Sequence, residues 1–170
     1  MRYRRAAAIL SAAAVLALAG RALSQPVPAN VAVSFSPGAT EQALAAAVGR
    51  ARSEVLVIAP SFSSRRVAQA LLAAMRRKVR VRIVTTSTGL GDPAGFVAGL
   101  GIAGAPLRVH GGAVSVSAAV LDRTLVYTGP DLFAAPAQRI ADAVEIRSPA
   151  VASLYAALFE QLWQTGVEVR

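Results

Sequence analysis

Four polar residues stand close enough in the sequence to carry chemistry together: His110, Ser115, Ser117 and Asp122. On a strand, residues two apart point to the same face, so Ser115 and Ser117 would face one site. A serine that attacks a phosphate needs a base beside it and a cation that holds the phosphate oxygens. His110 is the only histidine in the chain, but its offset of five from Ser115 puts it on the opposite face of a continuous strand. The pair Gly111-Gly112 also indicates a turn between them. A His110-dependent or Ser115-dependent reaction is therefore less favoured than serines that only fill space on an inward strand face.

The elements that must position these residues alternate between strands and helices. Apolar and alternating runs predict strands at 31–35, 54–60, 79–86, 106–109, 113–121, 124–129 and 142–146. Apolar stripes at helical spacing predict helices from Thr40 to about Arg52, from Ser63 or Ser64 to Arg77, around 93–100, and from Pro149 to about Gln164. A hairpin turns at Asp122-Arg123. This order predicts an α/β fold, a mixed β-sheet flanked by helices on both faces.

The first 24 residues have the pattern of a secretory signal peptide. Arg2, Arg4 and Arg5 precede an apolar run at 6–19, and Ala22-Leu23-Ser24 offers small residues for cleavage. The run is shorter than the roughly 20 apolar residues that span a bilayer. We therefore expect cleavage near Ser24, with an uncleaved anchor as the alternative. The expected organisation is a signal peptide at 1–24 and a single domain at 25–170, exported to the periplasm or secreted, with no transmembrane domain in the mature chain.

Positive charge is the main compositional signal, and it is moderate. The whole chain carries 18 basic and 9 acidic residues; four of the basic ones lie in the signal segment, which leaves an excess of five. Arg80 and Arg82 share one face of the predicted strand 79–86, and Arg108 lies on the strand before the serines. We expect the Arg80/Arg82 face to be solvated, and these three arginines are the candidates for weak binding of phosphate ligands or nucleic acid. The chain has no cysteine, and nothing in it indicates a metal site or a cofactor.

Several collinear segments give the chain a resemblance to a known family. These are "VSFSPGA", "ARSEVLVIAPSFSSRRVAQALLAAMRRKVRVRIV", "GIAGAPLRV", "VLDRTLVYTG" and "ADAVEIRSPAVASLYAALFEQLWQTG". In this order they resemble the phospholipase D superfamily, and within it the secreted bacterial endonucleases that have one catalytic motif per chain. The resemblance implies a phospholipase D-like fold and a homodimer with its site on the two-fold axis.

The family signature, His-x-Lys-x4-Asp, is degenerate in this chain. Counted back from Asp122, the histidine position holds Ser115 and the lysine position holds Ser117. In the family the histidine attacks phosphorus, the lysine holds phosphate oxygens and the aspartate helps to orient a histidine. Three further family positions are also altered, and hold Pro130, Leu132 and Ala141.

The resemblance and the altered motif together predict an exported phospholipase D-like domain that binds rather than cleaves. Its expected ligand is a phosphate-bearing molecule, nucleic acid or a partner protein. Two alternatives stay open: an active endonuclease or phospholipase that uses unorthodox residues, with His110 the weak candidate, and an accessory subunit that pairs with an intact homologue.

Overall fold

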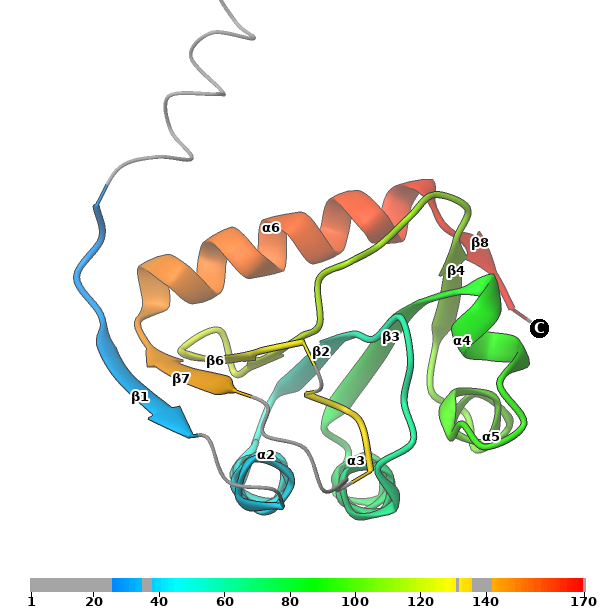
Figure 1. Cartoon of the computed structure of the whole chain (residues 1–170), viewed down its shortest axis with the longest axis horizontal. Coiled ribbons are helices and arrows are strands. Elements are labelled where there is room, and N and C mark those ends of the chain that lie inside the picture. Colours follow the sequence, from blue (N-terminus) through cyan, green and yellow to red (C-terminus); the bar gives the residue numbers. More distant parts are fainter. Residues whose placement is uncertain (1–25, 35–37, 131, 136–141, 170) are drawn as a thin grey trace, which may run out of the picture.

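The computed structural model describes residues 26–34, 38–130, 132–135 and 142–169. Its centre is a mixed sheet of eight strands in the order β1-β7-β6-β5-β2-β3-β4-β8. The strands are β1 Asn30–Ser34, β2 Glu54–Ile58, β3 Arg80–Thr86, β4 Leu107–His110, β5 Ala118–Leu121, β6 Leu125–Thr128, β7 Ala143–Arg147 and β8 Val167–Glu168. The helices are α2 Ala39–Arg50, α3 Arg65–Arg76, α4 Ser87–Gly91, α5 Val97–Ile102 and α6 Pro149–Thr165. The predicted α/β class, with helices on both faces of a mixed sheet, is confirmed (Figure 1).

Helices cover both faces of the sheet, so its central strands are buried on both sides. Helices α2, α3 and α5 lie on one face, and the long helix α6 crosses the other (Figure 1). Along β2, Val55 and Val57 enter the core under α2 and α3, while Leu56 and Ile58 enter the core under α6. All five residues of β2 are buried, as the continuous apolar run predicted.

The helix boundaries follow local capping. The Ser64 hydroxyl accepts the Val67 N–H at the start of α3, and the Ser148 hydroxyl accepts the Val151 N–H at the start of α6. The helix that was predicted to start at Thr40 begins one residue earlier, at Ala39, and Gly38 precedes it in a left-handed conformation.

Two other predicted elements differ from the structure. The expected strand 113–121 begins only at Ala118, so Ser115 and Ser117 precede β5 in a segment without regular structure. The helix expected around 93–100 corresponds to α5, which begins only at Val97, and α4 before it was not predicted. Strand β8 was not predicted; it adds two residues that pair with β4.

The strand pairing defines two opposite edges of the sheet. At the carboxyl edge β2, β3, β4 and β6 end and β5 and β7 begin, because Ile58 pairs with Ala118, Thr86 with His110 and Thr128 with Val144. At the amino edge β2 and β3 begin, the β5–β6 hairpin turns and β7 ends.

The predicted signal peptide at 1–24 lies outside the described residues. None of the helices in the described ranges is long and apolar enough to cross a membrane.

Candidate functional site

The carboxyl edge gathers three of the four residues that the sequence singled out for chemistry. His110 ends β4, and Ser115 and Ser117 lie in the segment that leads into β5. Ligands of open α/β sheets bind outside the carboxyl ends of the parallel strands, which here are β2, β3 and β4. This edge is therefore the candidate site.

Close backbone approaches build this edge. A Cβ atom on Gly89 would lie 2.2 Å from the Pro60 carbonyl oxygen, so only glycine lets α4 pack against the end of β2. The Thr86 hydroxyl donates to the same carbonyl at 3.1 Å and accepts the Gly89 N–H at 3.1 Å. On the other side of the edge, a Cβ on Gly129 would lie 2.4 Å from the Asp142 carbonyl oxygen. These backbone approaches and the Thr86 hydroxyl fix the positions of the loops at this edge.

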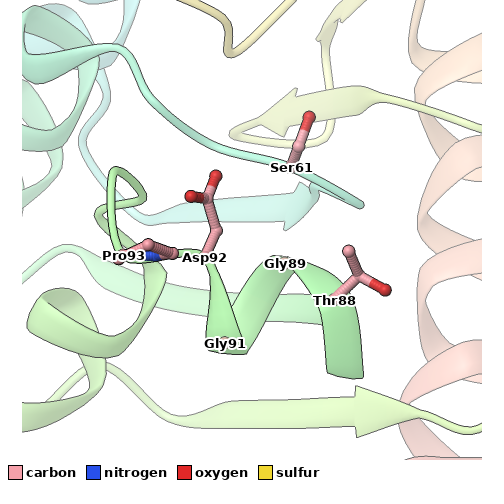
Figure 2. Close-up of a pocket in the computed structure, with 6 residues that line it drawn as sticks. All are labelled: Ser61, Thr88, Gly89, Gly91, Asp92 and Pro93. Carbon is pink, nitrogen blue, oxygen red and sulfur yellow. The ribbon is translucent and has the colours of Figure 1, made fainter.

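A hollow of about 410 Å³ opens at this edge between α4 and the segment after β2. Its lining residues are Ser61, Thr88, Gly89, Gly91, Asp92 and Pro93. Figure 2 shows that Asp92 projects from the end of α4 toward the segment that carries Ser61. Two hydroxyl groups and a carboxylate offer no positive charge, so the hollow does not favour a phosphate.

The two motif serines differ in their surroundings. Ser115 is exposed and Ser117 is half-buried. The Ser117 carbonyl oxygen accepts the Thr128 hydroxyl at 3.0 Å and the Gly129 N–H at 3.4 Å, so its backbone is tied to the end of β6. Among the described residues, neither serine side chain has a histidine or a cation as a hydrogen-bond partner.

His110 is engaged locally. Its Nδ1 atom lies 3.1 Å from the Gly112 backbone nitrogen, which donates to it, so the ring is tied to the bend that follows β4. The turn predicted at Gly111-Gly112 is present as this bend. Among the described residues, the other ring nitrogen, Nε2, has no hydrogen-bond partner.

Asp122 lies at the other end of β5, in the hairpin turn at the amino edge, and the structure does not bring it together with the two serines. Its carboxylate accepts the backbone N–H groups of Arg52, Ser53 and Glu54 at 2.9, 2.8 and 3.1 Å. The Ser53 hydroxyl donates to it at 2.7 Å. Burial alone would raise the pKa of Asp122, but these hydrogen bonds outweigh it and lower the pKa below its usual value. Asp122 therefore ties the hairpin to the start of β2.

The three candidate arginines are all engaged within the fold. Arg80 donates to Glu54 at 2.6 Å. The expectation that Arg82 lies on a solvated face is wrong, because it lies beneath α6 with its side chain only 16% exposed and binds Glu160 through both terminal nitrogens. The hydrogen bond from Arg82 lowers the pKa of Glu160. Arg108 donates to the Trp163 carbonyl oxygen at 2.6 Å.

Aromatic rings of α6 cover two of these arginines, Arg82 and Arg108. The guanidinium of Arg82 stacks 5.1 Å from the Phe159 ring centroid, and that of Arg108 lies 4.9 Å from the Trp163 ring centroid. Alternation along β3 predicts a polar face, but it does not show which helix will cover it.

The structure describes two of the three further positions at which the chain differs from the family, Pro130 and Leu132. Leu132 is 1% exposed and belongs to the core under α2 and α3, while Pro130 is exposed. Ala141 lies outside the described residues. Across the described ranges no group of three or more histidine, cysteine, aspartate or glutamate residues is placed to hold a metal ion.

Solved structures provide the comparison with known proteins. No family model and no curated protein sequence matches the chain. Nuc, a phospholipase D family member from Salmonella typhimurium, matches with a TM-score of 0.76 and 27% identity over 84% of this chain and 99% of Nuc. NucT from Helicobacter pylori matches with a TM-score of 0.69 and 13% identity over 84% of this chain and 100% of NucT. TrmBL2, an archaeal chromatin protein, matches with a TM-score of 0.65 and 18% identity over 96% of this chain and 62% of TrmBL2.

The order of strands and helices and these likenesses assign the chain the phospholipase D superfamily fold. Within that class it resembles Nuc, whose length it covers almost completely. The family expected from the sequence is therefore confirmed at the level of the fold.

Proposed function

We propose that this protein is an exported phospholipase D-like domain that binds a phosphate-bearing ligand, nucleic acid or a partner protein without cleaving phosphodiesters. One observation carries the proposal. The described loops of the carboxyl edge, which are 60–64, 86–93, 110–117, 128–130 and 142, contain no lysine or arginine. Arg65 and Arg66 follow one of these loops, at the start of α3, where Arg66 pairs with Glu41. The positions that resemble the family's histidine and lysine are serines.

The chemistry of phosphodiester cleavage supports this reading. A covalent mechanism needs a nucleophile and a cation that stabilises the charge on the phosphate oxygens in the transition state. Ser115 has neither a base nor a cation among its described contacts, and the nearby hollow carries the carboxylate of Asp92. TrmBL2, a chromatin protein with a novel mode of DNA binding, is similar in fold, which is consistent with a binding role for this chain.

The resemblance to Nuc and the single motif support a homodimer that uses the carboxyl edge, with export after cleavage near Ser24. Under this proposal, light scattering at micromolar concentration gives twice the monomer mass. A dimer that forms only after an intact homologue is added would favour the accessory-subunit alternative.

Turnover is the decisive test. The purified protein is incubated with a chromogenic phosphodiester and with plasmid DNA, with Nuc as the positive control and EDTA present to remove adventitious metal-dependent nucleases. We expect no product above the buffer control. Turnover that is lost in the His110→Ala variant would overturn the proposal and establish the active-enzyme alternative.

A further inference from the structure

Exposed basic side chains gather at the amino edge of the sheet, opposite the candidate site. Eight of the twelve lysine and arginine residues in the described ranges lie there, and all eight are exposed: Arg50, Arg52, Arg76, Arg77, Lys78, Arg80, Arg123 and Arg147. They come together because α2 and α3 both end at this edge, β3 begins there, the β5–β6 hairpin turns there and β7 ends there. We call these eight residues the basic pole.

Only part of this charge is neutralised inside the fold. Glu54 lies between Arg80 and Arg123 and binds both, at 2.6 and 2.5 Å. Glu145 pairs with Arg147 at 2.5 Å, and the Asp122 carboxylate is occupied by backbone N–H groups. Eight cations against three carboxylates leave an excess of five positive charges.

The rest of the described chain has no such excess. Its charged residues are Arg65, Arg66, Arg82 and Arg108 against Glu41, Asp92, Asp142, Glu160 and Glu168. A general enrichment in arginine would distribute cations over the whole surface, whereas here the positive charge lies at one edge. Such an asymmetric field attracts a polyanion to that edge.

The side chains at the pole suit phosphate groups. Seven of the eight are arginines, whose planar guanidinium can bind two phosphate oxygens at once. A small polar hollow of about 140 Å³ lies at the pole, with Arg50 and Arg147 among its lining residues. A membrane surface is a weaker fit, because interfacial binding also uses large apolar side chains. In the described chain, none of the exposed large apolar residues lies in the loops 50–53, 76–80 and 122–124.

We propose that the basic pole binds the phosphate backbone of nucleic acid, on the edge of the sheet opposite the candidate site. The proposal deepens the binding half of the proposed function and does not depend on whether the carboxyl edge is inactive. Because phosphate contacts carry no sequence information, binding is independent of sequence, with a Kd of roughly 10⁻⁴–10⁻⁶ M at physiological salt. If about four phosphates are neutralised, log K falls with log salt at a slope of about −3.6.

Two matched double variants test whether DNA binds at the basic pole. Arg52→Gln with Arg76→Gln removes two charges from the pole, and Arg65→Gln with Arg66→Gln removes two from the start of α3, at the opposite edge. Binding of the purified protein to a short fluorescent DNA duplex is followed by anisotropy at several salt concentrations. Thermal melting checks that each variant is folded.

We expect the pole variant to lose affinity at low salt and to reduce the slope by about 1.8, and the control to bind like the parent. Equal losses in both variants, or no DNA binding at low salt, would overturn the proposal. Binding to anionic phospholipid vesicles but not to DNA would assign the pole to a membrane surface instead. The turnover assay reports separately on the proposed function, because DNA can bind at the pole whether or not a phosphodiester is cleaved elsewhere.

Discussion

Replacing Asp122 tests whether this residue is a structural tie rather than part of a catalytic group. Its carboxylate accepts four donors, the N–H groups of Arg52, Ser53 and Glu54 and the Ser53 hydroxyl. The residue also has a φ of +48°, in the left-handed region that favours glycine. Replacement by glycine therefore lowers stability because the hydrogen bonds are lost, and raises it because the left-handed strain is relieved.

The expected loss in the free energy of unfolding follows from these contacts. A hydrogen bond to a charged group contributes about 1.5–3 kcal/mol, but Arg52 and Ser53 are exposed, so water replaces part of what is lost. We therefore take about 0.5–1 kcal/mol per donor, which gives a loss of about 2–4 kcal/mol for Asp122→Ala. Asp122→Gly recovers about 1 kcal/mol of left-handed strain. Lys78→Gly is the matched control, because Lys78 has a φ of +69° and an exposed side chain; it should gain stability slightly.

Chemical denaturation of these variants measures the free energy of unfolding directly. Thermal melting gives a second measure, because in a domain of this size a loss of about 2–4 kcal/mol lowers the Tm by roughly 5–12 °C. If the free energy of unfolding of Asp122→Ala lies within about 0.5 kcal/mol of the parent's, the hydrogen bonds of Asp122 do not stabilise the fold, which would contradict the structural role assigned to this residue.

The pH dependence supplies an independent check. Because the folded-state pKa of Asp122 is lowered, its stabilisation is fully present above the unfolded value of about 3.9. That stabilisation is lost as the pH falls through the lower, folded value. Asp122→Asn has no carboxylate to titrate, so it should be less stable than the parent at pH 7 and approach it in strong acid. A stability gap that stays constant down to pH 2 would contradict the assignment.

Two further predictions concern the carboxyl edge and α6. Gly89→Ala brings a Cβ to 2.2 Å from the Pro60 carbonyl oxygen and should cost more than about 2 kcal/mol by urea denaturation. Gly99→Ala, in α5 with no atom within 4 Å of the new Cβ, should gain about 0.5–1 kcal/mol, and a loss there would contradict this reading of the two sites. Arg82→Lys keeps the charge but loses the two-pronged contact with Glu160 and the stacking on the α6 rings, so it should lower stability by about 1–3 kcal/mol. An unchanged denaturation midpoint would show that only the charge of Arg82 matters.

Elements with strong local signals could be predicted from the sequence. Strand β2 followed from its apolar run, α3 from the cap at Ser64, and α6 from the proline at its first turn. The hairpin turn at Asp122-Arg123 also followed from residue type, since both residues adopt a positive φ. In each case the residues that determine the element lie within it.

Features that depend on distant contacts could not be predicted. The burial of Arg82 depends on α6, whose residues Phe159 and Glu160 lie nearly 80 positions away in sequence. The segment before Ala118 has the alternation of a strand, but Ser115 has no ladder partner in the described structure. The clustering at the basic pole is likewise a result of topology, because its cations come from four separate segments of the chain, 50–52, 76–80, 123 and 147.

The three positions that resemble the family motif have different physical roles in this fold. Ser115 is exposed and Ser117 is held through its backbone carbonyl, so the fold places few demands on either side chain. Asp122 satisfies three backbone N–H groups at the start of a central strand, and removing it should cost several kcal/mol out of the roughly 5–15 kcal/mol that stabilises a typical domain. Side chains at the first two positions are therefore not needed for folding, whereas replacement of Asp122 should endanger the fold. Folding stability alone accounts for the aspartate, so its presence is not evidence that phosphodiester cleavage persists.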